Sequence, residues 1–175
     1  MNKTILGWDI GGAHLKAVLL DDTGQAVKVW QVACPLWQGL DKLTAAVEGI
    51  YDALDVVPSF HAITMTGELA DIFSDRAAGV LQISQLMSDR FENAHFYAGR
   101  AGFVSSENVS TRSMQIASAN WFASAEFVAN VVRDGLFIDI GSTTCAVSRL
   151  RACIRALPSC RISPGCRPAS WLHNR

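Results

Sequence analysis

Apolar runs separated by short polar turns dominate the start of the chain. Residues 4–10, 15–20 and 26–33 are either apolar throughout or alternate between apolar and polar positions, as strands do. Short turns separate these runs, and the first turn contains Gly11 and Gly12, which tolerate positive φ. The pattern therefore predicts a three-stranded antiparallel meander.

Beyond the meander, helical and strand-like segments alternate. Apolar side chains recur at helical spacing over residues 40–54, which predicts an amphipathic helix. Further helices are expected over residues 68–91, with a break at Gly79, and from 118–120 to about 132. Further strands are expected at residues 61–66, 94–98, near Phe103, 136–140 and 143–150. Antiparallel strands followed by alternating helices and strands predict an α/β fold in which helices cover a mixed sheet.

The composition is that of a folded domain. Of the 175 residues, 50% are hydrophobic and 18% are charged, which excludes a disordered chain. The formal net charge of −1 provides no basic field, so we expect no nucleic-acid partner. No apolar run approaches the roughly 18 residues of a membrane span, and the N-terminal run is too short for a signal peptide. The sequence therefore predicts a cytoplasmic protein without a membrane partner.

The last segment differs in composition from the rest. Residues 145–175 contain no acidic residue and no lysine, but they hold six arginines and four of the five cysteines. The cysteine spacing lacks a CxxC pair, which disfavours a zinc site, and a basic binding arm is a second alternative. We favour a third hypothesis, in which residues 151–175 are non-native sequence from a shifted reading frame and are disordered.

One pattern occurs twice. Residues 5–13 (ILGWDIGGA) and 136–144 (LFIDIGSTT) each lead from an apolar strand through Asp-Ile-Gly into small residues and a second strand. Because glycine lacks Cβ, such a turn lets backbone N–H groups approach anionic oxygens. A single copy is ordinary turn chemistry, but the repeat favours two hairpins that clamp a polyphosphate.

The two hairpins define a candidate site for a small phosphorylated molecule. Asp9 and Asp139 end the two strands and are candidate ligands of Mg²⁺, the cofactor that we expect. The candidate phosphate-binding residues follow these aspartates in the chain and are Gly11, Gly12, Lys16, Gly141, Ser142 and Thr143.

Four stretches of the chain resemble one family. They are residues 8–16 (WDIGGAHLK), 65–71 (MTGELAD), 118–121 (SANW) and 137–144 (FIDIGSTT). They resemble the tetrahydromethanopterin-linked one-carbon transfer pathway proteins of the hydantoinase/oxoprolinase-like group. This group belongs to the superfamily of acetate kinases, sugar kinases, heat-shock chaperones and actin. The resemblance implies a ribonuclease-H-like fold in which the two hairpins are the phosphate motifs.

Archaeal proteins of this group are similar to a synthase of methanofuran biosynthesis. The resemblance implies a transferase that joins a furanmethyl group, supplied as a diphosphate, to the phenol of γ-glutamyltyramine, with Mg²⁺ bridging the diphosphate and the aspartates. A carboxylate near the phenol would act as base, and Glu68 and Asp71, just past a strand end, are the candidate catalytic residues. The competing interpretation of either acid is a favourable charge in the first turn of a helix.

The resemblance also divides the chain into parts. Residues 1–134 correspond to a first ribonuclease-H-like lobe, and residues 135–150 to the first hairpin of a second lobe whose remainder is missing. We expect such a truncated chain to be inactive or nearly so. The alternatives are an ATP-dependent kinase or ATPase of the same superfamily, which releases ADP rather than diphosphate, and a non-catalytic fragment that binds no magnesium polyphosphate.

Overall fold

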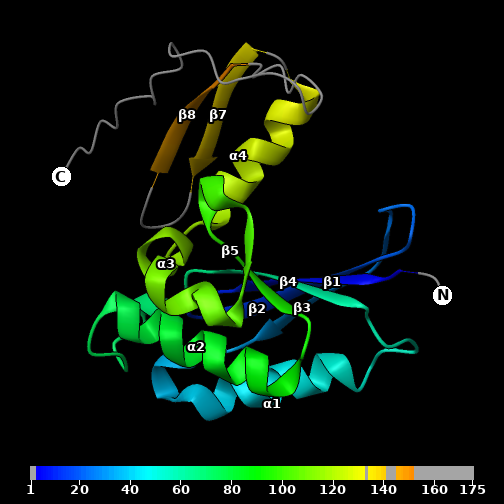
Figure 1. Cartoon of the computed structure of the whole chain (residues 1–175), viewed down its shortest axis with the longest axis vertical. Helices are drawn as coiled ribbons and strands as arrows, with labels where there is room; N and C mark the ends of the chain where they lie inside the picture. The colour runs from blue at the N-terminus through cyan, green and yellow to red at the C-terminus, as the bar shows by residue number, and fades with distance from the viewer. Residues whose placement is uncertain (1–2, 133, 141–144, 152–175) are drawn as a thin grey trace. The chain divides into compact units, whose positions relative to one another are not determined.

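The computed structural model describes residues 3–132, 134–140 and 145–151 (Figure 1). The chain divides into two compact units, Met1–Asn120 and Trp121–Arg175. The boundary precedes Trp121 instead of following residue 134, so most of the last helix groups with the hairpin that follows it. The predicted tail lies outside the described residues, apart from Arg151.

The first unit is built on one six-stranded mixed sheet. Its order is β3-β2-β1-β4-β5-β6. The strands are β1 (Ile5–Ile10), β2 (His14–Leu20), β3 (Ala26–Ala33), β4 (Phe60–Met65), β5 (Ala94–Tyr97) and β6 (Phe103–Ser105). The first three form the predicted antiparallel meander, whereas β4 and β5 extend the sheet in parallel from β1. A meander on one side of β1 and parallel strands on the other confirm the predicted α/β, ribonuclease-H-like lobe.

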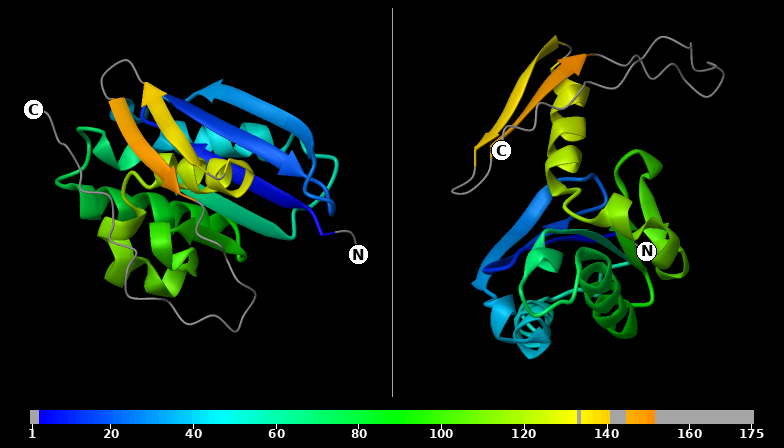
Figure 2. Two further views of the ribbon diagram at one scale, coloured as in Figure 1. Left: turned by 90° about the horizontal axis from the view of Figure 1, so that it is seen from above. Right: turned by 90° about the vertical axis from the view of Figure 1, so that its left-hand side faces the viewer.

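Helices α1 (Leu40–Tyr51) and α2 (Arg76–Arg90) lie together against one face of this sheet (Figures 1 and 2). Strand β1 shows how the sequence separates the two faces. Leu6, Trp8 and Ile10 are buried in the core between sheet and helices, whereas Gly7 and Asp9 alternate with them on the opposite face and are only half-buried. The polar end of β1 is thus kept out of the core.

Two local predictions in this unit are wrong. Gly79 does not break a helix but lies inside α2, where a Cβ would stand 2.8 Å from the carbonyl oxygen of Glu68. A glycine at this position allows close packing of the preceding loop. Helix α3 (Val109–Ile116) is missing from the predicted helices, because only its first and last residues are buried and leave no periodic pattern.

The second unit is a helix followed by a hairpin. Helix α4 (Asn120–Val131) is followed by strand β7 (Asp134–Ile140). Strand β7 pairs with β8 (Cys145–Arg151) in a two-stranded antiparallel sheet. The helix predicted to run to about residue 132 ends at Val131, and the strand predicted over residues 136–140 begins two residues earlier, at Asp134. No helix of the described residues is long and apolar enough to cross a membrane.

A buried histidine lies at the centre of the core of the first unit. His61 is 3% exposed, accepts a hydrogen bond at Nδ1 from Trp8 Nε1 at 3.1 Å, and stacks on Phe91 with ring centroids 3.9 Å apart. The guanidinium of Arg90 lies over the ring of Tyr51 beside it. Burial, and secondarily the positive charge of Arg90, lower the pKa of His61 from 6.5 to about 4.

We expect this histidine to make the fold sensitive to mild acid. Between the unfolded pKa of 6.5 and the folded pKa of about 4, the unfolded chain binds the extra proton, so lowering the pH favours unfolding. The free energy of unfolding should fall by about 2 kcal/mol between pH 7 and pH 5 because of this group. Urea titrations of the wild type and of His61→Gln, which keeps an acceptor for Trp8, measure the difference. Identical pH dependence of the two proteins would contradict the assignment.

Candidate functional site

Three turns meet at the carboxyl ends of the neighbouring parallel strands β1 and β4. They are the hairpin of residues 11–13 and two short 3-10 helices, η1 (Leu36–Gln38) and η2 (Gly67–Leu69). The Leu36 amide donates to the Gly12 carbonyl at 3.0 Å, and the Thr66 amide donates to the Ile10 carbonyl at 2.9 Å. The carboxyl ends of parallel strands are where α/β sheets hold ligands.

A pocket of about 330 Å³ opens among these three turns. Its lining residues come from all three and are Gly12, Trp37, Thr66, Leu69, Ala70 and Asp71. The fold therefore brings Gly12, predicted to bind phosphate, to the same pocket as Asp71, predicted to be catalytic. Sequence reasoning did not select Trp37, Thr66 or Leu69 for the site. A local signal for Trp37 is its position two residues after Pro35, a residue that interrupts strands and helices.

Asp9 and Lys16 lie beside this hairpin on the face of the sheet that the helices leave open. They are register partners across β1 and β2, and Lys16 Nζ lies 3.3 Å from Asp9 Oδ2. The side chain of Asp9 is 31% exposed, yet its second oxygen, Oδ1, is buried and has no hydrogen-bond partner among the described residues. A buried carboxylate oxygen without a donor is costly unless a cation or water satisfies it.

This oxygen fits the predicted magnesium. Mg²⁺ keeps several waters and binds through one or two carboxylates together with phosphate oxygens. In the part of the chain that the structure describes, no cluster of three His, Cys, Asp or Glu side chains could hold a metal ion. Asp9 offers one carboxylate for such a cation.

The first hairpin offers backbone donors. The Gly11 amide donates to the His14 carbonyl at 3.0 Å and closes the turn, whereas the amides of Gly12 and Ala13 have no acceptor within the described ranges. The predicted reason for the glycines is wrong, because neither Gly11 nor Gly12 has a positive φ. Gly11 is required by close approach instead: a Cβ there would lie 2.9 Å from the His14 carbonyl oxygen.

This difference gives a matched pair of variants. We expect Gly11→Ala to lower the free energy of unfolding by about 2 kcal/mol, because the added methyl must displace hairpin backbone. Gly12→Ala should change it by less than about 0.5 kcal/mol, because a Cβ at Gly12 meets no atom within 4 Å. Thermal and urea unfolding of the two variants measure both values. Equal destabilisation would show that close approach does not explain Gly11.

The two candidate catalytic acids have different surroundings. Asp71 is exposed at the pocket, but the side chain of Glu68 is fully buried and does not line it. Glu68 Oε1 accepts a hydrogen bond from Ser118 Oγ at 2.6 Å and lies 3.4 Å from Arg76 Nη2. Arg76 also donates to Ser118 Oγ at 2.9 Å, and Ser118 has a φ of +51°. Glu68 thus links η2, the start of α2 and the segment before α4.

The second predicted phosphate hairpin is described only in part. Asp139 lies in β7 opposite Ala146, and its side chain is not among the described ones. Gly141, Ser142 and Thr143 lie outside the described residues. Their roles stay predictions.

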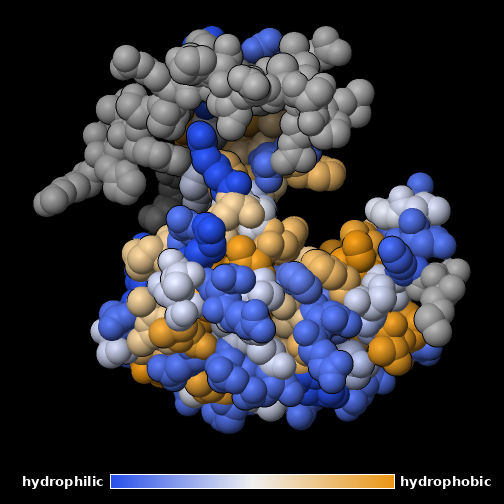
Figure 3. All heavy atoms as spheres, viewed as in Figure 1, coloured by the Kyte–Doolittle hydropathy of each residue, from blue (hydrophilic) through white to orange (hydrophobic). Residues whose placement is uncertain are grey.

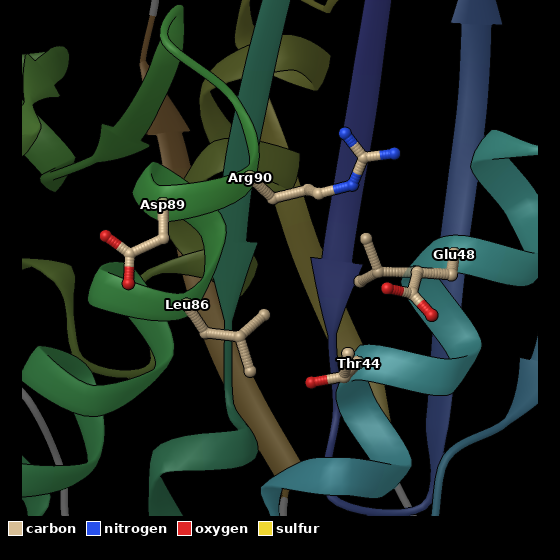
Figure 4. A pocket seen from close by; sticks show the side chains of 6 residues that line it. Thr44, Glu48, Leu86, Asp89 and Arg90 are labelled. Atoms are coloured by element: carbon tan, nitrogen blue, oxygen red, sulfur yellow. The ribbon is translucent and has the colours of Figure 1, made fainter.

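A second, smaller pocket lies between the helices (Figure 4). It has a volume of about 200 Å³, and its lining residues are Thr44, Val47 and Glu48 of α1 and Leu86, Asp89 and Arg90 of α2. None of these residues belongs to a predicted motif. Its two carboxylates and its lack of turn amides make it a poor site for an anionic ligand.

The fold and the site define a ribonuclease-H-like α/β lobe with a ligand pocket at the carboxyl ends of two parallel strands. The model of the hydantoinase/oxoprolinase family matches residues 60–156, so the chain belongs to the hydantoinase/oxoprolinase family. This confirms the family that the sequence motifs indicated.

One curated relative is the (4-{4-(2-(gamma-L-glutamylamino)ethyl)phenoxymethyl}furan-2-yl)methanamine synthase of Methanocaldococcus jannaschii. The two chains are 32% identical over 146 residues, which cover 82% of this chain and 42% of the synthase. The chain thus spans less than half the length of this relative.

Two solved sugar-acid and sugar kinases are similar at lower levels. A ROK family glucokinase from Streptomyces griseus, in complex with glucose and AMPPNP, gives a TM-score of 0.45 at 17% identity over 87% of this chain and 45% of the kinase. A gluconate kinase from Lactobacillus acidophilus gives a TM-score of 0.31 at 19% identity over 38% of this chain and 16% of that chain.

Proposed function

We propose that the first hairpin, at the carboxyl end of β1 and beside this pocket, binds the magnesium-bound diphosphate of a furanmethyl diphosphate. We propose further that the reaction it serves transfers the furanmethyl group to a phenol. The observation that carries the proposal is the buried, unpartnered Oδ1 of Asp9 beside Lys16 and the open amides of Gly12 and Ala13. Together they offer a cation ligand, a positive charge and two anion donors within one hairpin.

The residues of the first unit have separate roles in this proposal. Asp9 holds Mg²⁺, which neutralises charge on the leaving diphosphate. Lys16 and the Gly12 amide contact the diphosphate oxygens. The predicted roles of Asp139 as a Mg²⁺ ligand and of Gly141, Ser142 and Thr143 as phosphate-binding residues are kept as proposals.

The proposed chemistry is a substitution at carbon. The phenol oxygen forms a bond to the furanmethyl carbon, the bond from that carbon to the diphosphate oxygen breaks, and its electron pair leaves with the diphosphate. The phenol proton passes to the exposed carboxylate of Asp71. The relative supports this class of product, since its printed name describes a phenoxymethyl group on a furan.

A comparison of ligands tests the proposal. Inorganic diphosphate, a furanmethyl diphosphate and ATP are titrated into the full chain in the presence of Mg²⁺. The proposal predicts that the two diphosphates bind at least about tenfold more tightly than ATP. If γ-glutamyltyramine supports turnover, the released product should be diphosphate.

Two other outcomes would replace the proposal. Preferential ATP binding with release of ADP would identify a kinase or ATPase of the same superfamily. Failure of all three ligands to bind would identify a non-catalytic fragment.

A further inference from the structure

Two large apolar side chains stand exposed at the mouth of the pocket. Trp37 is 54% exposed and Leu69 is 57% exposed, and each comes from a different turn. Exposed hydrophobic residues also occur singly on the surface of this protein (Figure 3), but these two line one concave site. Large aromatic and aliphatic side chains at a pocket mouth are typical of ligand contacts.

The turn that carries Trp37 is fixed on both sides. Leu36 is fully buried, and its amide bonds to the carbonyl of Gly12. A Cβ on Gly67 would lie 2.7 Å from Leu36 Cδ2, so the glycine lets η1 and η2 pack closely. Trp37 is therefore presented on a short, well-anchored turn, which lowers the entropic cost of using it to bind a ligand.

The remaining lining residues give the pocket a polar side. Gly12 belongs to the hairpin assigned to the diphosphate, and the Asp71 carboxylate is exposed at the same pocket. Its volume of about 330 Å³ exceeds that of a benzene-binding cavity, which is about 150 Å³. The pocket is therefore large enough for an aromatic ring with one hydroxyl group.

We propose that Trp37 and Leu69 form a slot for the aromatic ring of the acceptor and hold its hydroxyl group toward Asp71. This rests on the proposed function, because the slot serves the phenol that receives the transferred group. The slot makes Trp37 a specificity-determining residue: it selects a planar aromatic acceptor over an aliphatic alcohol. Its contribution is separate from that of Asp9 and Lys16, which face the diphosphate.

Indole N–H resonances test the slot directly. The chain has five tryptophans, and the resonance that Trp37→Phe removes from the spectrum of the ¹⁵N-labelled full chain is that of Trp37. Tyramine is titrated alone, and magnesium diphosphate is titrated alone. We expect tyramine to shift the Trp37 resonance, Trp37→Ala to weaken tyramine binding about tenfold, and Trp37→Phe to restore most of it.

Val57→Ala is the control, because Val57 is also a highly exposed apolar residue but lies outside the pocket. It should leave tyramine binding unchanged. The folded state of each variant is verified by its amide spectrum, and Leu69→Ala provides a second, independent loss of slot surface.

The outcomes separate the slot from the proposed function. The slot is overturned if Trp37→Ala binds tyramine as tightly as the wild type does, or if the wild type does not bind tyramine. Either result holds whether or not diphosphate binds. Tyramine binding lost in Trp37→Ala, with diphosphate binding retained, supports the slot. If the wild type binds tyramine through Trp37 but no magnesium diphosphate, the slot stands and the diphosphate assignment fails.

Discussion

Asp9→Asn is expected to weaken the affinity of the full chain for magnesium diphosphate about 100-fold. The change keeps the shape of the side chain but removes the charge of the oxygen that is buried without a partner. It also frees Lys16, whose ammonium lies 3.3 Å from the carboxylate. Metal-free diphosphate should therefore bind the variant as well as, or better than, it binds the wild type.

Calorimetric titrations of diphosphate, one with Mg²⁺ and one with a chelator, measure the two affinities of each protein. Asp22→Asn is the matched control, because Asp22 is an exposed carboxylate in the turn after β2, at the end of that strand opposite the first hairpin. It should bind both ligands as the wild type does. Equal weakening of metal-bound and metal-free diphosphate by Asp9→Asn would contradict the assignment of Asp9 to the cation.

Glu68→Ala is expected to lower the free energy of unfolding by about 4 kcal/mol. The Glu68 side chain is fully buried, so its removal leaves a cavity. It also removes the acceptor of the 2.6 Å bond from Ser118, a residue held at positive φ, which favours another backbone conformation once that bond is lost.

Two further variants separate the parts of this network. Glu68→Gln keeps the volume and an acceptor for Ser118, so we expect a loss of only about 1 kcal/mol. Arg76→Ala should cost about 2 kcal/mol, because Arg76 is 44% exposed and water replaces part of its interaction with the buried carboxylate.

The same variants distinguish anchoring from catalysis. Glu68→Gln should retain the magnesium diphosphate affinity of the wild type. A stable Glu68→Gln protein that loses magnesium diphosphate binding would contradict an anchoring role.

The sheet of the first unit could be predicted from sequence because its strands have recognisable local patterns of apolar and polar residues. Residues 26–33 were predicted as a strand and form β3 with the same bounds, and the helical spacing over residues 40–54 gave α1. The prediction of a helix break at Gly79 is wrong because the glycine serves tertiary packing: it makes room for the Glu68 backbone. Helix α3 has too few buried positions to produce a periodic signal.

The candidate site was predictable where its residues are neighbours in the chain. Asp9, Gly12 and Lys16 belong to one hairpin, and the strand-end rule selected Asp71. Trp37 reaches the pocket only because η1 bonds to the hairpin, which no local pattern encodes. Nor does sequence alone separate Glu68 from Asp71, since the path of the chain after η2 decides which acid is buried.

The most direct test of the account is a map of where magnesium diphosphate binds. Titration into the ¹⁵N-labelled full chain should shift the amides of Gly12 and Ala13 most, together with those of Lys16 and Thr66, which lie at the carboxyl ends of β1 and β4 or beside them. The amides of Thr44, Glu48, Leu86 and Asp89, around the pocket between α1 and α2, should stay unchanged. Shifts confined to that helical pocket, or no shifts at all, would contradict a diphosphate site in the first hairpin.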